Sequence, residues 1–237
     1  MGKDKKVVVL TGAGISAESG IKTFRDSNGL WENHDVMEVA SPQGWDKNPE
    51  LVLKFYNQRR MQLLEVEPNP GHLALVELEK HFDTAIVTQN VDDLHERAGS
   101  KNILHLHGEL SKVRSVSNAE LIYDYSGKEV QLGDAAEDGG QLRPHIVWFG
   151  ESVPNIELAV WMASEADIML IIGTSMQVYP ANTLVDYAPD HAEIYYIDPQ
   201  PLTYITRHKV TEVNEKGSTG IPKVVGELIE RYGKSGE

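Results

Sequence analysis

Two amides and a carboxylate follow one apolar run and have the groups needed to bind a carboxamide. Gln89, Asn90 and Asp92 come directly after TAIVT, which is typical of a buried strand. A carboxamide offers one acceptor and two donors, so a neighbouring amide and carboxylate can satisfy it completely. An asparagine that caps the next helix is the alternative, and locally the more ordinary one.

Two histidines stand close together in ILHLHGEL. His105 and His107 are two residues apart, which places both on one face of a strand. Three interpretations are open: a metal-binding pair, a buried structural pair, or one general base. No cysteine and no nearby carboxylate pattern completes a metal site, so the metal interpretation is the least favoured.

A glycine-rich segment, TGAGISAESGIKTFR, follows the apolar run KKVVVL. Gly12, Gly14 and Ala17 match G-x-G-x-x-A directly after a strand, where glycines let the backbone approach a pyrophosphate at a helix N-terminus. A tight turn without a ligand is the alternative. An ordinary dehydrogenase would show an acidic residue at the end of a second strand about 20 positions on. Its absence here disfavours hydride transfer.

A second loop of small residues follows a later strand. GTSMQVYPA begins with Gly173, Thr174 and Ser175, and Asp198 ends a further strand in EIYYIDPQP. Two such loops favour a nucleotide lying across the switch point of a sheet. For Asp198, the start of a proline-containing turn is an equal alternative to a contact with ribose or adenine.

Apolar, β-branched runs alternate with helical patterns, which predicts an α/β fold with a doubly wound, mostly parallel sheet. Asn48 before Pro49 and Asn69 before Pro70 are typical helix starts. The expected strands are Lys6–Thr11, Thr84–Thr88, Ile103–Leu106, His145–Trp148, Ile168–Gly173 and Glu193–Asp198. The expected helices are Pro49–Val66, Pro70–His81, Ile156–Glu165 and Ile221–Tyr232.

Two regions break this alternation. Arg25–Trp45 mixes turn residues with aromatics and is expected to be a long structured loop, a kind of segment that tends to be functional. Val113–Arg143 predicts a hairpin that turns at Ser126 and Gly127, followed by an acidic, glycine-rich stretch. We expect this second region to be a small lobe inserted between strands of the main sheet.

Composition narrows the class of protein. The 237 residues suit one large α/β domain with a small lobe, and no apolar run is long enough to cross a bilayer. The net charge of −14 disfavours nucleic acid as a partner and mildly favours lysine-rich protein segments. The N-terminus lacks a signal-peptide pattern, so we expect a cytoplasmic location. The sequence has no cysteine, which excludes disulfides and thiolate sites.

Five motifs in order and in register, GAGISAESGIKTFR, TQNVDDLH, LHG, VWFGE and GTSMQVYPA, resemble the sirtuins, the NAD-dependent protein lysine deacylases. The resemblance runs from about Val7 to Gly226. It implies a single catalytic domain over 1–237. The large Rossmann-like part would comprise about 1–32, 68–112 and 144–237, and the small lobe about 33–67 and 113–143. It also implies that an acyl-lysine oxygen attacks the nicotinamide ribose of NAD, with release of nicotinamide and O-acyl-ADP-ribose.

The resemblance assigns roles residue by residue. His107 matches the general base, and Asn90 and Asp92 match the residues that bind the carboxamide. Phe24 would shield the ribose carbon from water. The residues expected to contact NAD are Gly12, Ala13, Gly14, Ser16, Thr23, Phe24, Arg25, Trp31, Gln89, Asn90, Val91, Asp92, Gly173, Thr174, Ser175, Asp198 and Thr219. The strand expected to pair with an acylated lysine segment contains Val147, Trp148, Phe149, Gly150 and Glu151.

The chain departs from the family at the zinc site that holds the small lobe in most relatives. Ser115 and Asn118 stand where the first C-x-x-C pair would be, so no zinc is expected. Hairpin pairing and apolar packing, through Leu121, Tyr123 and Tyr125, are expected to hold the lobe instead.

A helical pattern adds a specificity hypothesis. Val52, Phe55, Tyr56, Arg59 and Leu63 share one face, so Arg59 falls among apolar residues. A buried arginine needs an anion, either a structural carboxylate or a bound acid. The Y-x-x-R spacing is similar to that of bacterial sirtuins that remove succinyl or malonyl groups in preference to acetyl.

Two other functions share the nucleotide-binding features. An NAD glycohydrolase or ADP-ribosyltransferase would use the same departure of nicotinamide with another acceptor. A non-catalytic sensor of NAD or ADP-ribose would need no base, and the presence of His107 disfavours it. A monomer is expected.

Overall fold

The computed structural model describes residues 5–22, 30–31 and 34–233. Within these residues the main sheet has six parallel strands in the order β11-β10-β9-β1-β4-β5. The order reverses beside β1, which makes the doubly wound topology that the sequence predicts. The strands are β1 (Lys6–Thr11), β4 (Asp83–Thr88), β5 (Ile103–His105), β9 (Ile168–Ile172), β10 (Glu193–Ile197) and β11 (Val210–Val213).

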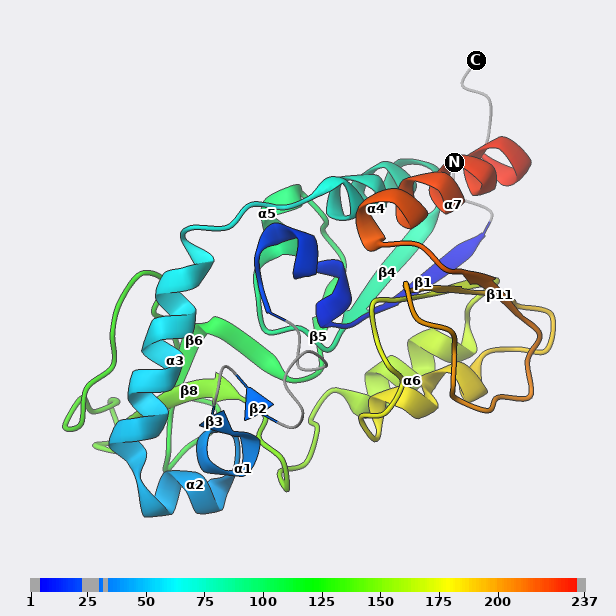
Figure 1. The fold of residues 1–237 in the computed structure, drawn as a ribbon. Helices are drawn as coiled ribbons and strands as arrows, with labels where there is room; N and C mark the ends of the chain where they lie inside the picture. The colour runs from blue at the N-terminus through cyan, green and yellow to red at the C-terminus, as the bar shows by residue number, and fades with distance from the viewer. Residues whose placement is uncertain (1–4, 23–29, 32–33, 234–237) are drawn as a thin grey trace.

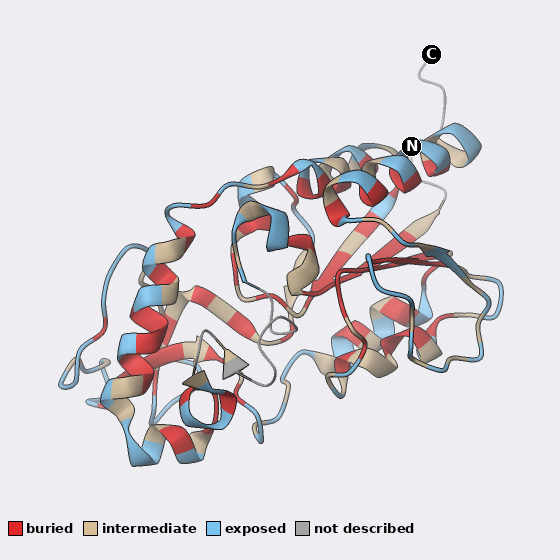
Figure 2. Ribbon diagram, in the orientation of Figure 1, coloured by how far each residue is buried: buried red, intermediate tan, exposed pale blue. Residues whose placement is uncertain are grey.

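Helices cover both faces of this sheet (Figure 1). Alternate residues of β1 enter two different cores: Val7 and Val9 pack with α4 (Pro70–His81) and α7 (Gly217–Tyr232), whereas Val8 and Leu10 pack with α6 (Ile156–Ser164). The 3₁₀ helix η4 (Ala181–Tyr187) joins α6 on that second face. Figure 2 shows the resulting burial along the central strands. The unbroken apolar runs of the sequence follow from burial on both faces.

The two helix starts predicted at Asn48 and Asn69 are formed, whereas α7 begins four residues before the predicted Ile221. The side chain of Asn48 accepts a hydrogen bond from Leu51 N at the start of α3 (Pro49–Leu63), and that of Asn69 accepts one from Gly71 N at the start of α4. No helix in the described part of the chain has the length and apolar character needed to span a membrane. The remaining helices are α1 (Val36–Val39), α2 (Pro42–Lys47), α5 (Leu94–Ala98), η1 (Ala13–Ile15) and η2 (Ala17–Ser19).

A second group of elements lies beside the main sheet and contains α1, α2, α3 and a small antiparallel sheet (Figure 1). The order of that sheet is β7-β6-β8. Two short strands, β2 and β3, occupy part of the region predicted to be a loop. The strands are β2 (Leu30–Trp31), β3 (His34–Asp35), β6 (Gly108–Ser115), β7 (Ile122–Asp124) and β8 (Leu142–Ile146).

Two predictions about this sheet were wrong. β7 pairs with β6 and not with the residues beyond Ser126 and Gly127, so the predicted hairpin does not form. β8 was expected in the main sheet but pairs antiparallel with β6. β7 pairs with the strand before it instead of the residues after it, and β8 pairs with a strand far back in the chain. Periodicity alone does not reveal either choice of partner. The strands of the small sheet lie between Gly108 and Ile146.

Buried hydrogen bonds and apolar contacts join α3 to the small sheet. Asn57 donates to Val130 O and accepts from Val130 N, and the fully buried Arg60 donates to Leu110 O, Lys128 O and Asn57. Burial lowers the pKa of Arg60 to about 10, so it remains charged at neutral pH. An apolar core of Leu53, Val113, Val130 and Leu142 lies beside these hydrogen bonds. Tyr123 and Tyr125 pack against it as predicted, whereas Leu121 is not among its described contacts.

The site of the family's zinc has a different structure. Ser115 donates to both carboxylate oxygens of Asp138 at 2.9 Å, and Asp138 accepts from Gly140 N. Ser115 also accepts from Ser117 N at 3.0 Å. A hydroxyl and a carboxylate that are already bonded to each other do not fit a thiolate zinc site. A hydrogen-bonded turn closes this end of the small sheet.

The first glycine turn packs directly on the loop after β9. Gly12 N donates to Ile172 O and Gly14 N donates to Gly173 O, at 2.9 and 2.8 Å. A Cβ at Gly14 would lie 2.6 Å from Gly173 Cα, so neither turn leaves room for a side chain. These glycines therefore serve protein packing in addition to any approach to a ligand.

Gly173→Ala should destabilise the protein more than an ordinary substitution at positive φ. Its φ is +61°, and an added Cβ would lie 2.4 Å from Ile15 N. The left-handed conformation costs about 1–2 kcal/mol for an L-residue, and the backbone clash adds to that cost. Urea denaturation should show a larger loss than for Gly133→Ala, where φ is +98° but nothing lies within 4 Å. Equal losses would contradict the packing argument.

Candidate active site

The predicted site residues gather at one edge of the main sheet. The strands β1, β4, β5 and β9 are parallel, so the loops that follow them leave from the same edge. The glycine turn follows β1, Gln89 to Asp92 follow β4, His107 follows β5, and Gly173 to Ser175 follow β9. Residues from four distant stretches of the chain are thus brought together.

Two buried hydrogen bonds, both at the hydroxyl of Ser16, join Asn90 and Asp92. Ser16 Oγ donates to Asp92 Oδ2 at 2.9 Å and accepts from Asn90 Nδ2 at 3.1 Å. Asp92 Oδ1 also accepts from Leu94 N. Burial raises the pKa of Asp92 to about 6, although these hydrogen bonds and the charge of His105 act against the rise. The residue that precedes α5 is Asp93 and not Asn90, so the alternative in which Asn90 caps that helix is wrong.

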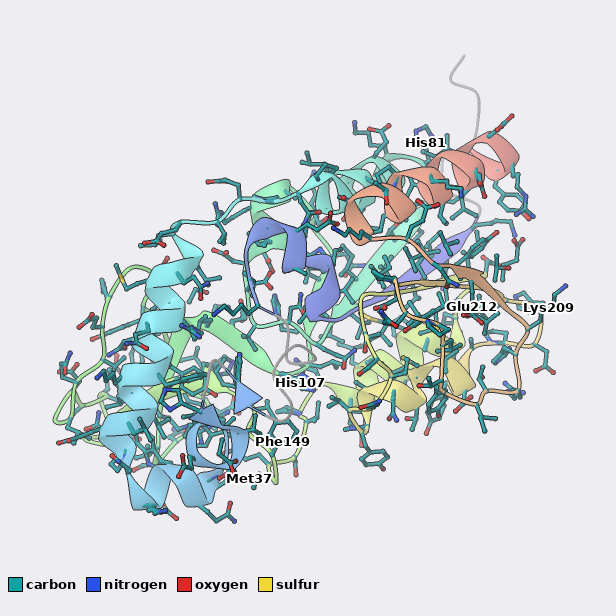
Figure 3. The ribbon with its side chains drawn as sticks, viewed as in Figure 1. Met37, His81, His107, Phe149, Lys209 and Glu212 are labelled. Carbon is teal, nitrogen blue, oxygen red and sulfur yellow. The ribbon has the colours of Figure 1, made fainter. Side chains whose placement is uncertain are left out.

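The contacts of His107 define which of its ring nitrogens carries the proton. Its Nδ1 lies 3.0 Å from the carbonyl oxygen of Gln89, which can only accept, so Nδ1 carries the proton. Nε2 then has a free lone pair. Burial lowers the pKa of His107, against the effect of the Gln89 carbonyl, so the neutral form predominates at pH 7. Figure 3 shows His107 between the main sheet and the elements around α1 and β2.

The turn after His107 depends on glycine. Gly108 has a φ of +84°, and an added Cβ would lie 2.0 Å from His145 O. Val147 N donates to His107 O at 2.9 Å on the same side. The backbone at the end of β8 is therefore packed against the backbone of His107 and Gly108.

The loop after β9 contacts the turn after β4. Gln89 Nε2 donates to Thr174 Oγ1 at 3.1 Å, and the hydroxyl of Tyr196 donates to Thr174 O at 3.0 Å. Ser175 follows and is half-buried. The two polar loops predicted from the sequence are thus neighbours in the structure.

The two residues expected to contact adenosine, Asp198 and Thr219, form hydrogen bonds within the protein. Asp198 is buried at the end of β10, and its Oδ1 accepts from Gln200 N, which is the turn that the alternative interpretation predicts. Thr219 is exposed on α7, and its hydroxyl donates to Lys216 O. The start of α7 reaches the glycine turn through Ser218, which donates from N and Oγ to Glu18.

One cavity lies between Asp92 and α3. Trp31 stands edge-on to Phe55, with ring centroids 5.0 Å apart. Thr23, Phe24 and Arg25, which were expected to close over NAD, lie outside the described residues. The cavity is lined by Ile21, Lys22, Trp31, Arg59, Gln62, Leu63, Val91, Asp92 and Leu110.

The two residues of α3 that suggested acyl selectivity, Tyr56 and Arg59, differ in burial. Arg59 is half-buried in the cavity wall, with its guanidinium 5.4 Å from the centre of the Phe55 ring. Tyr56 is fully buried, and its hydroxyl accepts from Trp148 Nε1 at 3.1 Å. The fully buried arginine of α3 is Arg60, which the helical pattern did not single out.

The segment expected to be a substrate-binding strand is a turn after β8. Phe149 N donates to Ala40 O, and Trp148 N donates to the carboxylate of Glu151. Glu151 also accepts two hydrogen bonds from Arg143, whose guanidinium lies 3.3 Å from the ring centre of Trp148. Phe149 and Gly150 are exposed. Sequence patterns did not reveal this ion pair, because its partners are eight residues apart across a turn.

Comparison with known proteins identifies the family. Residues 12–180 match the Sir2 family. The chain belongs to the Sir2 family. An NAD-dependent protein deacylase of Helicobacter pylori is 57% identical over 226 residues, which cover 95% of this chain and 98% of that protein.

Solved structures of Sir2 proteins have the same fold. A Sir2 homologue solved as a complex with NAD superposes with a TM-score of 0.86 at 36% identity, over 96% of this chain and 91% of the other. A Sir2 protein with a deacetylated p53 peptide and 3'-O-acetyl ADP ribose gives 0.77 at 27% identity, over 98% of this chain and 95% of the other. The Rossmann-like fold expected from the sirtuin resemblance is thereby confirmed.

The donor set at the sheet edge fits the nicotinamide part of NAD. The amide of Asn90 and the carboxylate of Asp92 complement a carboxamide, and both are held by Ser16 beside the cavity. Bound NAD would supply an electrophilic ribose carbon with nicotinamide as its leaving group. The chain itself supplies a neutral imidazole at His107 that can take a proton from a ribose hydroxyl.

His107→Ala should lower kcat for deacylation by roughly 10²–10⁴-fold, the usual contribution of a positioned base. NAD binding, measured by calorimetry, should change little because the hydrogen bonds of Ser16 to Asn90 and Asp92 remain intact. The exposed residue His191 provides the control, and His191→Ala should behave like the parent protein. Undiminished turnover in His107→Ala would remove the assigned role.

Asp92→Asn should separate stability from activity. The pKa of Asp92 is about 6 in the folded protein and its ordinary value is 3.8, so the native state binds the extra proton between these values. The parent protein therefore gains stability from this group as pH falls from about 7 to 4, and the variant should lack that gain. Urea denaturation at pH 8, 6 and 4.5 measures it, with exposed Asp46→Asn as control. A difference in the free energy of unfolding between parent and variant that is the same at all three pH values would contradict the assignment. The deacylase activity of the variant should fall at every pH.

Proposed function

We propose that this NAD-dependent protein deacylase removes succinyl and malonyl groups from lysine in preference to acetyl groups. The observation that carries the proposal is that Arg59 and Asp92 line the same cavity. A lysine whose acyl oxygen reaches the nicotinamide end of NAD would extend its acyl chain along this cavity. The far end of a succinyl or malonyl chain carries a carboxylate, which suits a guanidinium.

Arg59 has the properties needed to select an acid. A guanidinium stays protonated throughout the physiological range and can bind a carboxylate with two parallel hydrogen bonds. Around it the wall is largely apolar, with Ile21, Trp31, Leu63 and Leu110. Because such surroundings exclude water, they strengthen the attraction between a guanidinium and a bound acid. A neutral acetyl group would gain nothing from the same charge.

Tyr56 supports the same pocket from behind. Burial raises the pKa of Tyr56, so its hydroxyl keeps its proton, and its oxygen accepts from Trp148 Nε1. Its ring stands edge-on to Trp31, with centroids 5.9 Å apart. We assign Tyr56 the role of positioning Trp31, and the bond from Trp148 orients the Tyr56 hydroxyl. Arg59 makes the main contact to the acyl carboxylate.

Acylated lysine segments of proteins are the proposed partners. The turn at 147–151 would receive the peptide, with Phe149 and Gly150 exposed beside the base. Backbone recognition of this kind tolerates many sequences and leaves selectivity to the acyl pocket. We also propose that the NAD contacts, the division into a large part and a small lobe, the monomeric state and the cytoplasmic location are as the sequence predicts.

Arg59→Met should lower kcat/KM for a succinyl-lysine peptide by roughly 10–100-fold, because it removes a charged hydrogen-bond partner. The value for the acetyl-lysine peptide of the same sequence should stay within about threefold. Mass spectrometry of NAD-dependent product formation measures both, and O-acyl-ADP-ribose identifies the reaction. Arg207→Met, on the surface, controls for the loss of a positive charge. A preference for acetyl that Arg59→Met leaves unchanged would reject the selectivity, and NAD consumption without peptide would favour a glycohydrolase.

A further inference from the structure

His105 has no role in the proposed reaction, yet both of its ring nitrogens have close partners. Its Nδ1 lies 3.1 Å from the carbonyl oxygen of Asn90, and its Nε2 lies 2.8 Å from Glu96 Oε1. Only 10% of the His105 side chain is exposed, whereas 40% of the Glu96 side chain is exposed. Asn155 Nδ2 holds the backbone at the same residue by donating to His105 O.

The chemistry of these partners fixes the protonation of the ring. A carbonyl and a carboxylate can only accept, so both nitrogens of His105 must donate, and only the imidazolium has two N–H groups. His107 differs because Gln89 O engages its Nδ1 alone, for which a neutral ring suffices. The two histidines on one face therefore serve in opposite protonation states.

The charged surroundings agree with this assignment. Burial alone would lower the pKa of His105, but the hydrogen bond and charge of Glu96 from α5, with the charge of Glu109 from β6, raise it overall. Glu109 is itself paired with Lys112 at 2.7 Å. The other titratable groups that interact with the ring are His95 of α5 and Asp92 of the turn after β4.

The same cluster has the spacing of a metal site, which the sequence interpretation missed. The ligand atoms of Glu96, His105 and Glu109 lie within 4.8 Å of one another. A metal needs a free lone pair on the imidazole, and both ring nitrogens here face acceptors. The second acidic side chain instead stabilises the positive charge of the ring.

We propose that His105, as an imidazolium between Glu96 and the Asn90 carbonyl, is a positioning residue for the nicotinamide-binding pair Asn90 and Asp92. The inference rests on the proposed role of that pair. The two histidines hold consecutive carbonyls, Gln89 by a neutral His107 and Asn90 by a charged His105. The peptide at Asn90 therefore cannot rotate without breaking the charged hydrogen bond to His105. The positive ring also favours the ionised form of Asp92.

A pH window for NAD use follows. Asp92 must be ionised, which requires a pH above about 6. His105 must be protonated, so the pocket weakens as pH rises through its raised pKa. KM for NAD should therefore increase on the alkaline side as well as the acid side, and sensitivity to inhibition by nicotinamide should fall at the same alkaline pH.

The test follows KM for NAD and inhibition by nicotinamide from pH 5.5 to 9.5 in the full chain, with a saturating acyl-lysine peptide. Glu96→Gln removes the charge that raises the pKa of His105, so the alkaline limb should move down by about one pH unit. His105→Gln should abolish that limb and raise KM for NAD by roughly tenfold, with a smaller change in kcat. Thermal melts verify that each variant is folded.

A matched pair elsewhere supplies the control. His81 and Glu77 also lie within ion-pair distance, at 3.4 Å on α4, and His81 is far from His107 in Figure 3. His81→Gln should leave both limbs in place. Profiles of Glu96→Gln and His105→Gln that keep the parent shape would overturn the inference while Asp92→Asn still impairs NAD use. If Asp92→Asn also left KM for NAD and nicotinamide inhibition unchanged, the proposed carboxamide site itself would fall.

Discussion

The backbone of the turn after β4 is held from several directions, and the geometry of the candidate site depends on it. Gln89 N donates to Thr11 O, Asn90 N donates to Thr88 Oγ1, and Leu110 N donates to Val91 O. The two histidines after β5 bind the carbonyls of the same turn. Buried peptide groups must find partners. Here the partners come from strands on both sides, and the side chains of the turn are thereby aimed at one cavity.

This arrangement places polar and charged groups where burial disfavours them. Below the turn, Thr11 donates to Thr88, and its oxygen lies 3.0 Å from Nε2 of the fully buried His95. Burial lowers the pKa of His95 to about 3, so this ring is neutral under ordinary conditions. A carboxylate, a neutral base and a charged imidazole thus lie within one small region. Their different ionisation states follow from how deeply each group is buried and from the donors, acceptors and charges beside it.

The small sheet shows how the lobe is held without thiolates. Arg60 is enclosed by three backbone and side-chain oxygens, and Ser115 and Asp138 close the turn at the other end. Each contact alone is modest, since a typical intramolecular hydrogen bond contributes about 1 kcal/mol net. Together with the apolar cluster of Leu53, Val113 and Val130, they connect α3 to the small sheet, and Tyr56 of α3 accepts a hydrogen bond from Trp148 beyond β8.

Local patterns predicted much of the main sheet and its helices, because buried parallel strands and capped helices leave clear signatures over a few residues. They failed at β7 and β8, whose partners are distant or unexpected. They also failed at 147–151, where a glutamate and an arginine close a turn in place of a strand. Where strong motifs place several residues in order, the structure brings those that follow β1, β4, β5 and β9 to one edge of the sheet. The interactions of His105, Arg60 and Arg143 were not anticipated.

The sequence by itself determined the doubly wound order of elements, the family and the chemical types present at the sheet edge. The tertiary structure alone decided which nitrogen of each histidine bears a proton, which arginine of α3 faces the cavity, and which glycine turns touch. The physical reason is that element type depends on neighbouring residues and their periodicity. Protonation and selectivity depend on acceptors and charges brought together from distant parts of the chain.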